Sequence, residues 1–153
     1  MNSKKLFIWG FLFVSVIGSL LHFVYEWSGN NSIVRLFAPW NESTWEHMKL
    51  LFFPMLVLVL FLFFKLPEQS PIPVALSIGT LVGLALIPIL FYTYTGVLGF
   101  SVMAIDIAIF YISVLGIFLT GWFLKDNRKL ANRNGLLLTC LVILAILFFI
   151  FSY

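Results

Sequence analysis

The chain has 153 residues, which is the length of a single domain. Apolar residues make up 62% of it and charged residues only 10%, so a water-soluble fold could not cover its apolar core. The composition therefore excludes a soluble globular protein and predicts a domain whose solvent is a lipid bilayer. The net charge of +3 follows from the orientation of the helices, argued below, and indicates no nucleic-acid partner.

Five apolar stretches follow one another along the chain, each near the roughly 20 residues that cross a bilayer as a helix. We expect helices at about residues 6–26, 44–65, 72–93, 101–124 and 135–152. The second apolar run itself is short, so its helix reaches spanning length only if the amphipathic residues 44–49 form its outer turns. The sequence thus predicts an all-α membrane protein, with residues 1–153 forming one transmembrane domain of five helices.

Basic residues predict how these helices are oriented. If the N-terminus lies in the cytoplasm, only Arg35 and Lys49 lie on the outer side. All other Lys and Arg then lie on the cytoplasmic side, namely Lys4, Lys5, Lys65, Lys125, Arg128, Lys129 and Arg133. This bias is the positive-inside pattern, so we expect a cytoplasmic N-terminus and an extracytoplasmic C-terminus. The basic loop before the fifth helix could also contact anionic lipid, although the orientation explains its charge without that contact.

Both histidines and three of the acids lie at the end of the first predicted helix and the start of the second. His22 and Glu26 are four residues apart and therefore share a helix face. Ser43 and Glu46 fit a capping box, which would give Glu46 a structural role, and the helix dipole favours acids at this helix start. His47 has no comparable structural explanation.

Asp106 is expected about five residues inside the fourth helix, where a carboxylate costs on the order of 2.5–3.5 kcal/mol to insert. It either joins helices through a hydrogen bond or belongs to a functional site. With the N-terminus inside, its depth matches that of the other polar groups, and we predict one outward-facing pocket. The expected pocket is lined by His22, Glu26, Glu42, Glu46, His47 and Asp106.

Two imidazoles together with carboxylates form a mixed nitrogen and oxygen ligand set, which suits zinc, iron or manganese. The chain contains neither a His-Glu-x-x-His nor a Glu-x-x-His motif, so this prediction depends on shared depth and not on spacing. We expect the pocket to bind a divalent metal or a small polar ligand. The predicted metal ligands are His22, Glu26, Glu46 and His47, and the other predicted ligand-binding residues are Glu42 and Asp106.

The same residues also fit other functions. In a structural or partner subunit of a membrane complex, the polar cluster would only lock helices together. Chains of Asp, Glu and His also carry protons in transporters, and a metal site could assist hydrolysis at the membrane. Whether the protein is an enzyme stays open. The expected partners are the lipid bilayer itself and either a second copy of the chain or another membrane protein.

The stretches His22–Trp27 and Asn41–Pro54 (NESTWEHMKLLFFP) resemble those of a family of small multi-spanning membrane proteins of unknown function from Gram-positive bacteria. The resemblance extends over most of the chain. It implies a location in the bacterial inner membrane. It implies no activity, because the family has no established function.

Overall fold

The computed structural model describes residues 2–152, so Met1 and Tyr153, the two ends of the predicted domain, lie outside the described residues. The described residues form helices and contain no β-strand, which confirms the all-α class. The α-helices are α1 (Ser3–Trp27), α2 (Thr44–Lys65), α3 (Ile72–Leu98), α4 (Met103–Leu124) and α5 (Asn134–Ile150). Two short 3₁₀ helices are η1 (Val34–Leu36) and η2 (Arg128–Arg133).

Four of the helices, α1 to α4, are long and apolar enough to cross a membrane, which supports a multi-pass membrane protein. The fifth helix, α5, has 17 residues and rises about 26 Å, at the short end of the spanning range. α3 continues to Leu98, beyond the predicted end at residue 93. The hydroxyls of Thr93 and Thr95 bond back to carbonyls of their own helix, and the left-handed residue that ends the helix is Gly99.

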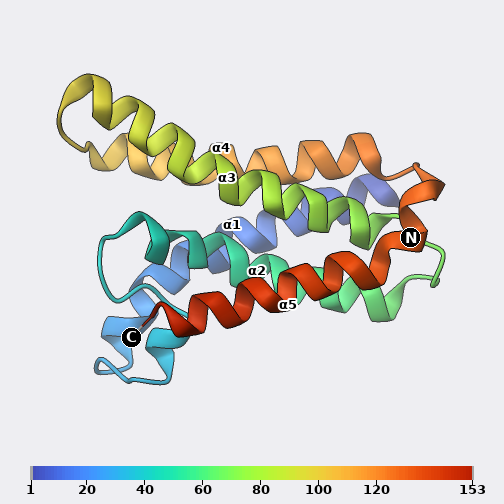
Figure 1. Cartoon of the computed structure of the whole chain (residues 1–153), viewed down its shortest axis with the longest axis horizontal. Coiled ribbons are helices and arrows are strands. Elements are labelled where there is room, and N and C mark those ends of the chain that lie inside the picture. The colour runs from blue at the N-terminus through green and yellow to red at the C-terminus, as the bar shows by residue number, and fades with distance from the viewer. Residues whose placement is uncertain (1, 153) are drawn as a thin grey trace.

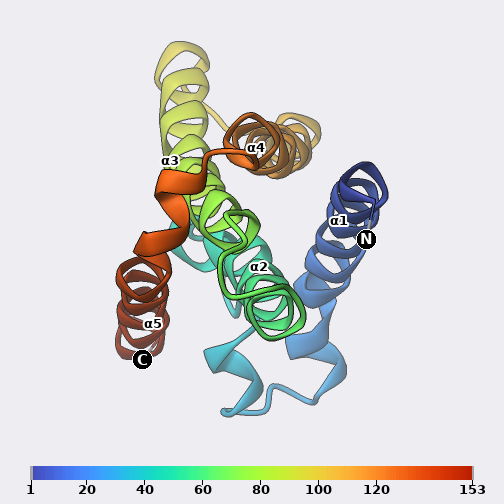
Figure 2. The same ribbon diagram turned by 90° about the vertical axis from the view of Figure 1, so that its right-hand side faces the viewer.

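The helices run alternately in opposite directions along the long axis of the molecule, and the two termini lie at opposite ends (Figure 1). α3 packs most extensively against α4 and next against α2, while α1 packs against α2 and α4. α5 stands to one side of the other helices, against α3 (Figure 2). The end at which α1 finishes and α2 starts is called the histidine end below. The opposite end, where α1 starts, is called the basic end.

Small residues set the closest helix approach. A methyl group added at Gly79 would clash with the carbonyl oxygen of Ile117, and one added at Gly83 would clash with the side chain of the same residue. The Gly79-x-x-x-Gly83 face of α3 is therefore covered by α4 of the same chain. Such small-residue faces let helix backbones approach closely where the bilayer supplies no hydrophobic driving force.

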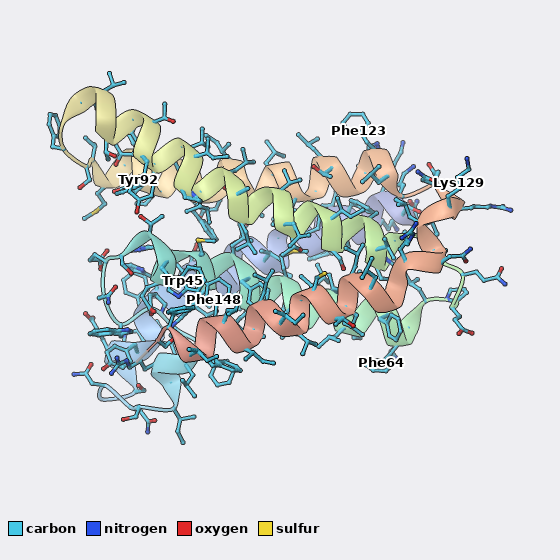
Figure 3. All side chains as sticks on the ribbon, in the orientation of Figure 1. Trp45, Phe64, Tyr92, Phe123, Lys129 and Phe148 are labelled. Carbon is cyan, nitrogen blue, oxygen red and sulfur yellow. The ribbon has the colours of Figure 1, made fainter. Side chains whose placement is uncertain are left out.

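Aromatic rings join α5 to the rest of the bundle at the histidine end. Phe148 is fully buried and its ring lies 4.6 Å from that of Trp45 and 4.9 Å from that of Phe52, between ring centroids. Phe149 stacks on Phe53 of α2. Figure 3 shows Trp45 and Phe148 side by side at this end. The contact between α2 and α5 thus consists largely of rings, which pack favourably in tilted and edge-on geometries.

Candidate functional site

The segment between α1 and α2, residues 28–43, brings the end of one helix back to the start of the next. It turns sharply after α1 through Gly29 and Asn30, which both have positive φ values of 69° and 62°. Glycine and asparagine are the residues that adopt this conformation at least cost. The segment then forms η1 and buries Ala38 and Pro39 before α2 begins. This path places the last turn of α1 beside the first turn of α2.

α2 starts with half of the predicted capping box. The hydroxyl of Ser43 accepts a hydrogen bond from the backbone N–H of Glu46, with the two atoms 3.3 Å apart. The reciprocal bond does not form, because the N–H of Ser43 donates to Oδ1 of Asn41 at 2.9 Å. The carboxylate of Glu46 is therefore available for another partner.

That partner is Lys49, one turn further along α2. Its ammonium group donates to Oε2 of Glu46 at 2.7 Å and to the carbonyl oxygen of Arg35 at 3.0 Å. Both side chains are buried. The same Oε2 lies 3.4 Å from the N–H of Trp40. Glu46, predicted as a metal ligand, instead forms a buried ion pair that ties the connecting segment to α2.

The histidines come together with Glu42. Suitable ligand atoms of His22, Glu42 and His47 all lie within 4.8 Å of one another. The ring centroids of His22 and His47 are 5.4 Å apart, and Nε2 of His47 is 3.2 Å from Oε2 of Glu42. His22 lies on α1, and His47 lies in the first turn of α2. Glu42 directly precedes Ser43, the cap of α2. These three residues are called the histidine triad below.

A backbone contact orients His47 within the triad. Its Nδ1 lies 3.0 Å from the carbonyl oxygen of Ser43. A carbonyl oxygen only accepts, so Nδ1 carries the proton, and in a neutral ring Nε2 then presents a lone pair toward Glu42. Two acceptors face each other unless a proton or a cation lies between them. Such a hydrogen bond to the far ring nitrogen is the usual support of a metal-binding histidine.

A small cavity opens beside the triad. It has a volume of about 110 Å³, enough for a few water molecules or a small polar ligand. It is lined by His22, Phe23, Tyr25, Glu26, Pro39, Trp40, Asn41 and Glu42. Glu26, predicted as a metal ligand, therefore lies next to the triad as part of the cavity wall. Glu42 is largely exposed, with 84% of its side chain accessible, so the site is open to solvent or ligands.

Asp106 does not join this site. It lies in the first turn of α4, and its Oδ1 accepts a hydrogen bond from the hydroxyl of Tyr94 on α3. The same hydroxyl accepts from the backbone N–H of Val102 at 3.1 Å. Both views place the turn between α3 and α4 in a different corner of the molecule from residues 28–43 (Figures 1 and 2). Asp106 thus closes the α3–α4 hairpin, which agrees with the interpretation that it joins helices through a hydrogen bond.

Two residues were not assigned these roles from the sequence. Glu42 was predicted to line the same pocket as both histidines, but as a ligand-binding residue and not as one of the metal ligands. Its position just before the helix cap was the available signal, since chain reversal there turns it toward α1. No role in the α3–α4 hairpin was predicted for Tyr94. It lies five residues before Gly99 and Asp106 lies seven residues after it, so the α3–α4 hairpin brings the helix turns that carry them near each other.

The sequence matches a known family over residues 1–153. No curated protein and no solved structure matches the chain. The family match confirms the resemblance to a family of unknown function noted from residues 22–27 and 41–54, and the histidine triad lies within those two stretches. The chain belongs to DUF6512, a family of unknown function.

Proposed function

We propose that this protein is an integral membrane protein that binds one divalent metal ion at the histidine end, through His22, Glu42 and His47. The observation that carries the proposal is the convergence of the three side chains, from two helices, within 4.8 Å. Two imidazoles and one carboxylate form the ligand set of many zinc and iron(II) sites that keep coordination positions open.

The distances within the triad fit a shared ion. Ligand atoms bound to a tetrahedral zinc at about 2.0–2.1 Å lie about 3.3 Å from one another. The distance between Nε2 of His47 and Oε2 of Glu42 is 3.2 Å, and the remaining separations, up to 4.8 Å, can be closed by small side-chain rotations. A cation at this position would also relieve the opposition of the two acceptor atoms. An open coordination position would face the cavity beside Glu26.

We further propose that all five helices cross the membrane, with the N-terminus in the cytoplasm. Seven of the nine Lys and Arg residues lie at the basic end of the bundle, which favours that end for the cytoplasmic side. α5 runs the full distance back to the histidine end (Figure 1). In this orientation the triad faces the extracytoplasmic side, where zinc or a small polar ligand would enter from solvent.

The test is the zinc affinity of the purified full-length protein, measured by competition with a chromophoric chelator. Wild type should bind one zinc per chain. His22→Ala, His47→Ala and Glu42→Gln should each weaken binding by at least about 100-fold, the upper end of what a change beside the ligands costs. Glu26→Gln is the matched control, an exposed acid in the same cavity but outside the triad, and should weaken binding by less than about ten-fold. A wild-type protein without zinc, or equal effects of both glutamate variants, would refute the assignment.

A second role is favoured by one observation, the buried Glu46–Lys49 pair with its bond to the carbonyl of Arg35. This contact holds the connecting segment to α2, and the triad could merely extend the same lock in a structural subunit. The two roles differ in what the histidines do without metal. If the triad is only a lock, His22→Ala lowers the thermal stability of the metal-free protein. If it is a metal site, that variant lowers stability only when zinc is present.

A further inference from the structure

The basic end of the molecule carries a strong local charge that the metal site does not use. Seven cations and two acids, Glu68 and Asp126, lie at this end and give it a net charge of +5. The histidine end has two cations and four acids, a net charge of −2. Three of these cations, Arg128, Lys129 and Arg133, lie within the six residues of η2, and their side chains are exposed. Only one acid lies within the adjoining connection, Asp126, and it pairs with Lys125.

Aromatic side chains show the level of this charge relative to a bilayer. Phe64 and Phe123 are about four-fifths exposed and point outward near the basic end (Figure 3). Trp9, near the start of α1, is also exposed. Trp near a helix end is typical of the membrane interface, because its amphipathic ring lies at headgroup level, whereas exposed Phe is apolar and suits the adjoining lipid. The ammonium group of Lys125 lies over the ring of Trp122, 4.4 Å from its centroid. η2 follows directly after this point, so its cations lie at the level of lipid phosphates.

We propose that η2 is a binding surface for anionic phospholipid headgroups, with Arg128, Lys129 and Arg133 as the residues that contact the phosphate. The guanidinium groups of the two arginines each offer paired donors that match phosphate oxygens, and the ammonium group of Lys129 adds a point charge. The complement to three exposed cations at headgroup depth is a lipid with net negative charge, such as phosphatidylglycerol. The surface is separate from the histidine triad and does not depend on metal.

Native mass spectrometry of the purified full-length protein can test this, with phosphatidylglycerol and phosphatidylcholine of identical acyl chains offered together. Wild type should retain phosphatidylglycerol preferentially. A cation near an anionic surface contributes about 1 kcal/mol, which is about five-fold in binding. The triple variant Arg128→Gln, Lys129→Gln, Arg133→Gln should therefore lose on the order of 100-fold of the preference.

Two controls make the result specific. The variant Lys4→Gln, Lys5→Gln, Lys65→Gln removes the same charge from the same end and should keep most of the preference. The charge-conserving variant Arg128→Lys, Arg133→Lys should keep most of it too, because charge supplies most of the attraction and the paired donors of arginine supply only the remainder. Equal losses in the two triple variants would mean diffuse attraction and overturn the proposal. Displacement of the lipid by inorganic phosphate alone would overturn it as well, because a soluble anion would then be the ligand.

Discussion

At the scale of single residues, the buried pair of Glu46 and Lys49 is the least expected feature of the histidine end. Both side chains are withdrawn from solvent near the start of a helix that is apolar from Leu50 to Phe64. Removing two charges from water is costly. The pair is tolerated because each partner neutralises the other and the carbonyl of Arg35 accepts a further hydrogen bond from the ammonium group. The position of the connecting segment, residues 28–43, therefore depends on Glu46 and Lys49, which bind its backbone.

We expect Glu46→Gln to lower the free energy of unfolding by about 3–5 kcal/mol, because it leaves the ammonium group of Lys49 buried without its counter-charge. The double variant Glu46→Leu, Lys49→Met should be less destabilised than this single variant, since no buried charge remains. Unfolding of the protein in detergent, followed by circular dichroism, measures both. Single and double variants of equal stability would contradict a stabilising role for the pairing.

The residues of the triad could be predicted only in part. His22 and His47 stood out because they are the only histidines in an apolar chain and lie at matching depths. The acid that lies beside the two histidines could not be predicted, because residue spacing does not show in which direction each glutamate side chain points. Glu46 turned to Lys49, three residues away on the same helix, while Glu42 gained its place through the turn before Ser43. Asp106 shared the depth of the site but not its corner of the bundle.

At the scale of helices, α3 and α4 form the most extensive contact of the bundle, and the small residues of α3 make it so close. Their hairpin is further closed by the bond between Tyr94 and Asp106. A Gly-x-x-x-Gly pattern in an apolar helix, such as Gly79-x-x-x-Gly83, indicates a close-packing face. Only the structure shows that α4 covers this face, because the pattern is the same whether the partner helix is in the same chain or in another copy.

Gly79→Ala should lower the melting temperature, because its new methyl group meets the backbone of Ile117 and α4 has to move away. We expect a loss of about 1–3 kcal/mol, typical of overpacking. Gly96→Ala is the matched control on the same helix. Nothing lies within 4 Å of the added methyl there, so it should be neutral or stabilising by up to about 1 kcal/mol. Similar melting temperatures for both variants in detergent would refute the close contact.

Helix positions were predictable because bilayer thickness sets the length of apolar runs. The start of α2 at Thr44 and its end at Lys65 follow from Ser43 as cap and Pro67 beyond. The end of α3 was predicted five residues too early. Polar threonines at the end of an apolar run favour a loop, but in a helix their hydroxyls can bond to carbonyls one turn back, as those of Thr93 and Thr95 do.

At the scale of the whole molecule, charge separates the two ends of the bundle. The basic end is suited to the cytoplasmic side and to anionic lipid, and the acidic end holds the histidine triad. The side on which the C-terminus lies depends on α5 crossing the membrane, because only an odd number of spans puts the two termini on opposite sides.

Alkaline phosphatase fused after the last residue should therefore be active in a bacterial host, since this enzyme needs the oxidising space outside the cytoplasm. A fluorescent protein fused at the same place should stay dark, and fused at the N-terminus it should fluoresce. An inactive C-terminal phosphatase combined with a fluorescent C-terminal fusion would show that α5 does not cross.

The central claim is that His22, Glu42 and His47 bind one metal ion together, and X-ray absorption at the zinc edge of the zinc-loaded protein tests it most directly. The account predicts nitrogen and oxygen ligands at about 2.0–2.1 Å, with the outer-shell scattering of two imidazole rings that falls to one ring in His22→Ala. A spectrum without imidazole scattering, or one unchanged by that substitution, would contradict it.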